Sequence, residues 1–221
     1  MAQYSTGLLN QFAPHMPELS ECNIPSLEEF KTTSNTWIQL YVLNSTFVYQ
    51  YPSPMHQLGI VFMRKAESAF HEFYYSRKLL NSYINTEILK NNNPNQQISQ
   101  YFELLHRFEV LISSIYQAFM VMKKFLAIDY DLWKPGDGSA LEKANILYNF
   151  IKHASSKINE TTTEPGYIIW LTNSEICCKD GSISYIEISE LLIELSENAK
   201  YYCITPQVLS EAQHQAQQQE T

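Results

Sequence analysis

The sequence predicts an all-α protein: an up-down helical bundle of four to five helices, with a small β-hairpin inserted before the last helix. The main observation is the spacing of apolar side chains. They recur every three to four residues over residues 55–89 and 98–128, as on the buried face of a helix. The chain also holds only six glycines among 221 residues, which disfavours a glycine-loop nucleotide fold and favours long helices.

A shorter helix is predicted ahead of the two long ones, over residues 26–49. It begins with the sequence SLEE, which matches a capping box. Residues 37–49 are rich in β-branched and aromatic side chains, so a strand is the alternative there. Pro52 and Pro54 end this element. An Asn-rich loop at 91–95 joins the two long helices, which should therefore lie antiparallel.

The second half of the chain predicts a further helix, a hairpin and a closing helix. Residues 129–139 (DYDLWKPGDGS) form a loop in which Asp137 or Ser139 caps a helix over residues 140–160. Three short segments then have strand character, and Asp180-Gly181 is a two-residue hairpin signature. The strands are expected at 167–171, 176–179 and 182–185, and the last helix at 187–202.

All of these elements fit one helical-bundle domain, residues 26–205, because 221 residues suit a single domain. Residues 1–25 hold three prolines and no sustained apolar period, so we expect an irregular N-terminal arm that apolar residues such as Leu19 anchor on the core. Residues 206–221 end in a Gln-rich segment, which predicts a disordered tail.

The composition indicates a folded, acidic, cytoplasmic domain. Apolar residues make up 45% of the chain and charged residues 17%, which suits a buried core. A net charge of −8 disfavours a protein whose main task is to coat nucleic acid. The four cysteines have no CxxC or metal-ligand spacing, no segment resembles a signal peptide, and the longest apolar stretch, 110–127, is too polar to span a membrane. We therefore expect no cofactor, no metal and no membrane contact.

A possible chemical motif lies on the helix predicted over residues 140–160. Asn149 and His153 are four residues apart, so they lie one above the other on the same side of that helix. A histidine can donate or accept a proton near pH 7, and the amide one turn before it can orient a phosphate. The sequence contains no nucleophile signature and no phosphate loop. This pair is therefore the leading candidate for chemistry.

The two long helices, the NFIKH sequence at 149–153 and the closing helix after a variable insertion together resemble the HEPN superfamily, over residues 55–203. HEPN ribonucleases carry an arginine, a polar residue, three further residues and a histidine. On this chain Asn149 matches the polar residue and His153 the histidine, whereas Tyr148 stands at the arginine position. The resemblance implies a homodimer across the motif helices. It also implies a role in a bacterial or mobile-element system, such as a toxin–antitoxin pair or phage defence.

RNA cleavage needs a cation to stabilise the charge that develops on phosphorus, and tyrosine brings none. Arg64, which precedes His71 by seven residues on one helix face, is the first candidate to supply it from across the bundle. Glu67 is placed to pair with either of them, which predicts a solvated ion-pair face as the alternative. Lys152 adjoins His153, but neighbours on a helix point about 100° apart.

Lys152 and Arg107 are the candidate RNA-binding residues. Arg107 follows His106, and Glu103 lies three to four residues before both, a spacing that suits ordinary surface ion pairs. The alternative is that Glu103, His106 and Arg107 line a cleft.

Three functions remain open. The leading hypothesis is a HEPN-like, catalytically degenerate, homodimeric protein that acts as a protein-interaction or RNA-contacting module. The second is a metal-independent endoribonuclease in which His153 is the general acid or base, Asn149 orients the phosphate, and Arg64 or Lys152 stabilises charge. The third is a structural or regulatory bundle unrelated to HEPN.

The three hypotheses predict different surroundings for His153. The enzyme predicts that His153, Asn149 and a cation converge on a cleft. The interaction module predicts an exposed aromatic or apolar patch, near residues 167–171 or 201–202. The structural bundle predicts a buried, fully hydrogen-bonded His153 and no cleft.

Overall fold

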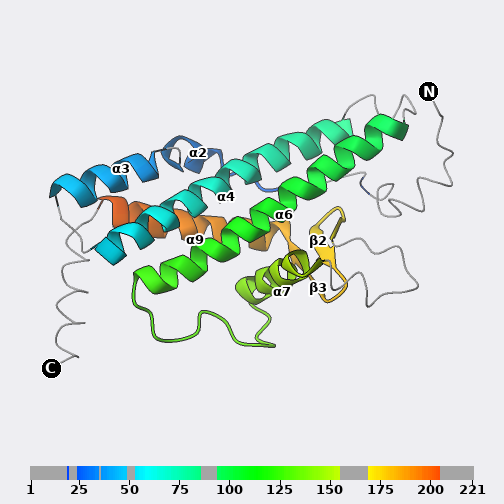
Figure 1. The fold of residues 1–221 in the computed structure, drawn as a ribbon. Helices are drawn as coiled ribbons and strands as arrows, with labels where there is room; N and C mark the ends of the chain where they lie inside the picture. The colour runs from blue at the N-terminus through cyan, green and yellow to red at the C-terminus, as the bar shows by residue number, and fades with distance from the viewer. Residues whose placement is uncertain are drawn as a thin grey trace.

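The computed structural model describes residues 19, 24–34, 36–48, 53–85, 94–154 and 169–204, which form a mostly helical bundle (Figure 1). A small antiparallel sheet of three strands, in the order β1-β2-β3, precedes the last helix. The predicted all-α bundle with a small β insertion is therefore confirmed. The elements in chain order are α2 (Glu28–Ser34), α3 (Trp37–Leu43), the π-helical turn η2 (Asn44–Val48), α4 (Ser53–Asn85), α6 (Pro94–Phe125), α7 (Ala140–Lys152), β1 (Trp170–Leu171), β2 (Glu175–Cys178), β3 (Gly181–Ser184) and α9 (Tyr185–Ile204).

The long helices α4 and α6 run antiparallel and side by side, as predicted, and their contact is the most extensive between any two elements (Figure 1). α4 begins at Ser53, so Pro54 lies in its first turn and does not end the preceding helix. Proline is tolerated there because the first N–H groups of a helix have no helical partner. α6 likewise begins at Pro94, a residue predicted to lie in the loop. No helix in the described part of the chain has the length and apolar character of a membrane span.

The helix predicted over residues 26–49 is divided into α2, α3 and η2. The strand alternative is wrong for residues 37–48, which are helical. α3 begins where the carboxylate of Glu67, on α4, accepts a hydrogen bond of 2.8 Å from the backbone N–H of Ile38. Glu67 thus caps α3 from another helix, and it satisfies an N–H group that the first turn of α3 leaves without a helical partner.

The cap also corrects the prediction that Glu67 pairs with Arg64 or His71. Burial raises the pKa of Glu67, and the hydrogen bonds from the N–H groups of Ile38 and Trp37 oppose that rise. Arg64 is exposed and makes no hydrogen bond or ion pair with the described residues.

Two aromatic side chains hold α3 on α4. Trp37 is buried, and its ring meets Phe70 edge-on with the centroids 5.2 Å apart. Tyr41 is fully buried and its hydroxyl donates a hydrogen bond of 3.3 Å to the carbonyl of Met55. The ring of Tyr41 lies against Gly59, where a Cβ atom would come within 2.0 Å of the hydroxyl oxygen. Helices α3 and α4 therefore approach closely only because residue 59 has no side chain.

Most of the predicted N-terminal arm and all of the predicted Gln-rich tail lie outside the described residues. Leu19 is buried in the core, which confirms its predicted role as an anchor.

The turn between β2 and β3 is one residue earlier than predicted. Cys178 pairs with Gly181, so the two-residue turn is Lys179-Asp180 and not Asp180-Gly181. Of the first predicted strand, over 167–171, the described part forms β1 at Trp170–Leu171, and residues 167–168 lie outside the described residues.

The other end of β3 is also one residue earlier than predicted, because the prediction missed a capping box there. The side-chain hydroxyl of Ser184 accepts a hydrogen bond of 3.2 Å from the N–H of Glu187, whose carboxylate accepts one of 2.9 Å from the N–H of Ser184. This reciprocal pair begins α9 at Tyr185, two residues earlier than predicted, and so ends β3 at Ser184.

We expect Glu187→Gln to lower the free energy of unfolding by about 1 kcal/mol at neutral pH, because glutamine keeps the cap but loses the ion pair with Lys143. Burial raises the pKa of Glu187, but the hydrogen bonds from Lys143 and Ser184 outweigh it and leave the pKa below the ordinary 4.5. A lowered pKa in the folded state means that the stabilisation is present above pH 4.5 and is lost as the pH falls through the folded-state value.

Urea denaturation of both proteins across this pH range measures the effect. The gap between wild type and Glu187→Gln should close on acidification. The control is Glu190→Gln, because Glu190 is an exposed carboxylate on the same helix with no hydrogen bond or ion pair among the described residues. A gap of constant size at all pH values would contradict the assignment.

Candidate functional site

The helix that carries the predicted motif is positioned by the loop before it. The hydroxyl of Ser139 accepts a hydrogen bond of 3.2 Å from the N–H of Glu142, which confirms Ser139 as the predicted cap. The Glu142 carboxylate accepts hydrogen bonds in return from the N–H groups of Gly136 and Gly138, both at positive φ. Asp137 also fastens the loop, and hydrogen bonds from Ser139 and Lys134 lower its pKa. This network fixes where α7 begins.

The histidine of the motif lies at the end of α7. The helix ends at Lys152, His153 is its C-cap, and the His153 N–H donates a hydrogen bond of 3.0 Å to the carbonyl of Asn149. Both side chains are exposed, and the Asn149 amide donates a hydrogen bond of 3.0 Å to the side chain of Asn145. An exposed His153 does not fit the buried, fully bonded histidine that a purely structural bundle predicts. The last residues of the helix predicted over 140–160 lie outside the described residues.

Tyr148 packs α7 against α6. Its ring stacks on Tyr116 with the centroids 4.6 Å apart, and burial raises the pKa of Tyr116. The ammonium of Lys152 lies 5.9 Å from the centroid of the Tyr148 ring, on its face. The position at which the HEPN pattern has an arginine therefore holds a packing residue, and the ammonium of Lys152 is directed to that ring.

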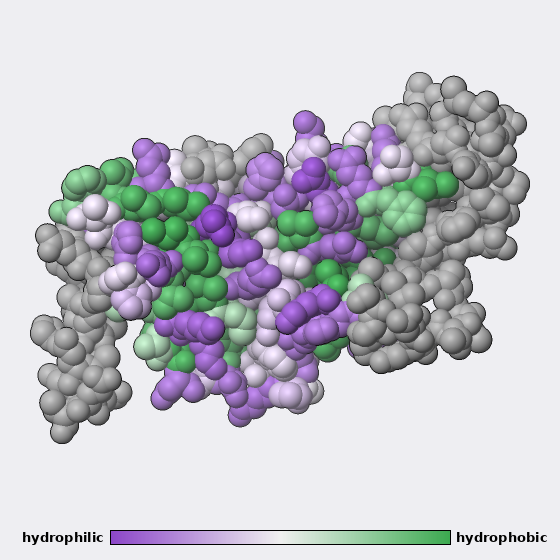
Figure 2. Space-filling view, in the orientation of Figure 1, coloured by the Kyte–Doolittle hydropathy of each residue, from purple (hydrophilic) through white to green (hydrophobic). Residues whose placement is uncertain are grey.

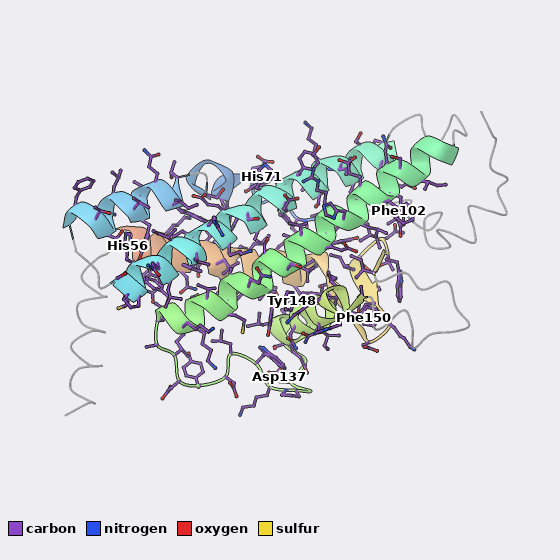
Figure 3. All side chains as sticks on the ribbon, in the orientation of Figure 1. His56, His71, Phe102, Asp137, Tyr148 and Phe150 are labelled. Carbon is purple, nitrogen blue, oxygen red and sulfur yellow. The ribbon has the colours of Figure 1, made fainter. Side chains whose placement is uncertain are left out.

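Arg64 belongs to the other side of the bundle. α7 packs mainly on α6, β3 and α9, whereas Arg64 is on α4, and α6 runs between α4 and α7. Figure 3 shows this separation, with His71 on α4 and Tyr148 on α7 to either side of α6. Within the described residues of one chain, the predicted group of His153, Asn149 and Arg64 is therefore not assembled, because Arg64 makes no hydrogen bond or ion pair with α7.

Arg107 faces α4 and does not form the predicted surface pair with Glu103. Its guanidinium lies 3.3 Å from the carboxylate of Glu72 and 4.3 Å from the centroid of the Tyr75 ring. The Glu72 side chain is only 12% exposed, so this ion pair joins the two long helices below the surface. His71 completes the cluster at 3.7 Å from Glu72. A cation neutralised in this way is poorly suited to hold RNA.

An open groove runs beside this cluster, along α4. Two cations line it: Lys78 is exposed, whereas Arg77 is engaged by Glu28, at 3.8 Å, and by the carbonyl of Ile24. The hydroxyl of Tyr74 donates to the carbonyl of Leu27, and burial raises the pKa of Tyr74 to about 12. These contacts attach residues 24–28 to α4. Its lining residues are Glu28, His71, Tyr74, Tyr75, Arg77, Lys78 and Asn81. The described residues contain no group of three or more His, Cys, Asp or Glu side chains that could hold a metal.

Three of the eight large apolar side chains that are exposed among the described residues lie together on α3 and η2. Leu40 is 39% exposed, Leu43 44% and Phe47 78%, and we call these three residues the α3–η2 face. The opposite side of the same helix carries the buried Trp37 and Tyr41. Figure 2 shows hydrophobic side chains gathered over this end of the molecule. All residues of α3 except Gln39 are apolar, and a helix with apolar residues on both sides is normally covered on both sides, so this face is the strongest candidate for a binding surface.

A signal for this face is visible in the sequence and was overlooked. Residues 32–63 contain no lysine, arginine, aspartate or glutamate, although charged residues make up 17% of the chain. The exposed patches predicted at residues 167–171 and 201–202 have different outcomes in the structure. Ile169 and Leu171 are buried in the core, so the described part of the first patch is wrong, whereas Tyr201 is exposed.

No protein-family model matches the chain, and comparisons with the curated proteins and with the solved structures found no match. Fold and surface together define a helical-bundle protein with a small antiparallel sheet and an uncharged apolar face.

Proposed function

We propose that this chain is a HEPN-like helical-bundle protein of the cytoplasm, with a degenerate motif, that acts as a protein-interaction module. The observation that carries the proposal is the exposed, uncharged α3–η2 face. Interfaces between proteins are depleted of charge and enriched in aromatic side chains at their centres, and Phe47 with its two leucine neighbours has that character. The face also lies on a helix whose other side is firmly held in the core, which suits a preformed docking surface.

The geometry of α7 supports the degenerate state of the motif. Tyr148 is committed to packing on Tyr116, Lys152 lies over the Tyr148 ring, and Arg64 is on a helix beyond α6. A histidine can exchange protons, but the extra charge on a phosphorane also needs a cation, and among the described residues neither Arg64 nor Lys152 is directed to His153. The motif residues are thus better suited to contact than to catalysis.

The proposal predicts that a photocrosslinker at the α3–η2 face captures protein in cells. With p-benzoylphenylalanine in place of Phe47, irradiation should give a covalent adduct above the mass of the chain. The matched control carries the same group at Tyr130, which is 65% exposed on the loop before α7. Its irradiation should give little or no adduct. Equal adduct at both positions, or none at position 47 with normal expression, would contradict an interaction through this face.

An endoribonuclease remains the second candidate, because His153 and Asn149 are both exposed at the end of α7, where a polymer has access. We expect no cleavage of RNA that depends on His153. The measurement is RNA cleavage by purified protein in the presence of a chelator, beside His153→Ala and the control His106→Ala, an exposed histidine that faces Glu109 at 4.0 Å. Cleavage that survives in His106→Ala and disappears in His153→Ala would establish the enzyme and refute the degenerate motif.

A further inference from the structure

We propose that the partner of the α3–η2 face is a second copy of this chain, bound through the same face about a two-fold axis. This inference rests on the proposed function and names the partner of that surface. The dimer implied by the HEPN resemblance runs across the motif helices, whereas this one leaves α7 and His153 outside the contact.

The first argument is electrostatic. Two copies of a chain with a net charge of −8 repel one another, and the repulsion is weakest where the contacting surfaces carry no charge. Residues 32–63 are the longest uncharged stretch of the chain, and they include all of α3 and η2 and the first part of α4. An acidic protein that pairs with itself has its best opportunity at this surface.

The second argument is geometric. In a two-fold contact, the same patch serves both subunits, so the patch must be complementary to itself. Leu40, Leu43 and Phe47 follow one another at spacings of three and four residues, as along the seam of paired helices. Antiparallel pairing about an axis next to Leu43 brings Leu40 opposite Phe47 of the second copy and the two Leu43 side chains together. A leucine thus packs against a phenylalanine at both ends of the contact.

The third argument is the local form of the helix. η2 is a π-helical turn, a rare form that occurs frequently at functional sites. It carries Phe47, the most exposed of the large apolar side chains among the described residues.

Membranes and nucleic acids would not find at the α3–η2 face the cations that usually attract them. Helices that lie on membranes carry lysine and arginine beside their apolar face, and nucleic acids need cations to neutralise their phosphates. Residues 32–63 provide neither lysine nor arginine.

The test is the mass in solution of the full-length protein by sedimentation equilibrium. The wild type should have twice the chain mass of 25.7 kDa. Phe47→Glu places two like charges in the contact and should give the single-chain mass, with an unchanged circular dichroism spectrum because the Phe47 side chain is mainly in water. Leu43→Glu should also give the single-chain mass and serves if Phe47→Glu does not fold. Tyr130→Glu and Asn149→Glu, on the α7 side, should remain dimeric.

Three outcomes overturn the inference: a wild type that is monomeric at every concentration reached, a dimer that persists in both Phe47→Glu and Leu43→Glu, or a dimer that only Asn149→Glu dissociates. The crosslinking experiment separates this failure from failure of the proposed function. A monomeric protein whose position 47 still captures another protein in cells keeps an interaction face but has a different partner. A monomer that captures nothing loses both.

Discussion

Replacing Gly59 by alanine is expected to lower the free energy of unfolding by about 2 kcal/mol, the size of a typical overpacking penalty less the helix propensity that alanine gains. The new Cβ atom would stand 2.0 Å from the hydroxyl oxygen of Tyr41 and 2.1 Å from the ring carbon that bears it. The Tyr41 ring is fully buried, and its centroid lies 6.1 Å from that of the His56 ring and 6.0 Å from that of the Phe125 ring. It therefore cannot move away from the new Cβ atom without displacing its neighbours. Either α3 moves away from α4 or the ring leaves the core.

A double-mutant cycle with Tyr41→Leu tests this explanation by urea denaturation. Tyr41→Leu destabilises the protein by itself, because it removes the aromatic contacts and the hydrogen bond to Met55. In that background the clash is gone, so Gly59→Ala should cost little or should stabilise the helix by up to about 1 kcal/mol. If Gly59→Ala is equally costly with tyrosine and with leucine at position 41, the clash is not the cause.

The second large effect concerns the ion pair between α4 and α6. Arg107→Ala is expected to cost about 2–3 kcal/mol, because it leaves the carboxylate of Glu72 without its main partner at a poorly hydrated position. The Glu72 side chain is 12% exposed and Arg107 29%, so the loss falls short of that for a fully buried pair. The substitution also removes the cation from the face of the Tyr75 ring, a contact that accounts for a further fraction of the loss, about 0.5–1 kcal/mol.

The matched control replaces both partners. Glu72→Leu with Arg107→Met fills the same space with apolar groups and leaves no unpaired charge, so the double variant should recover most of the stability lost in Arg107→Ala. His106→Ala, at the exposed neighbouring position, should change stability little. A double variant as unstable as Arg107→Ala would show that packing, and not the unpaired carboxylate, dominates at this site.

Local sequence determined the long helices. The apolar period of residues 55–89 and 98–128 sets α4 and α6, because one turn of helix repeats the same buried direction every three to four residues. Their antiparallel pairing follows from the shortness of the connection between them. The sequence also predicted the N-cap of α7 at Ser139 and a β-hairpin before α9. The junction of β3 and α9 was misplaced because the capping box Ser184–Glu187, itself a local signal, was read as strand.

Tertiary structure decided what depends on distant partners. α3 begins at Trp37 because Glu67, about 30 residues later, satisfies its N–H groups, and no local pattern contains that information. Arg107 pairs with Glu72 and not with Glu103, its neighbour in sequence. The pairing of α4 with α6 places the less hydrated carboxylate of Glu72 beside the guanidinium.

The candidate sites divide in the same way. The sequence determined that Asn149 and His153 share one end of a helix, since helical spacing alone requires it. Whether a cation joins them depends on the packing of α7, which directs Lys152 to the Tyr148 ring and leaves Arg64 on α4. The uncharged character of residues 32–63 is likewise plain in the sequence. Only the fold shows which side of α3 the core covers, because a helix with apolar residues on both sides and Gln39 as its one polar residue has no polar face to mark the side that meets water.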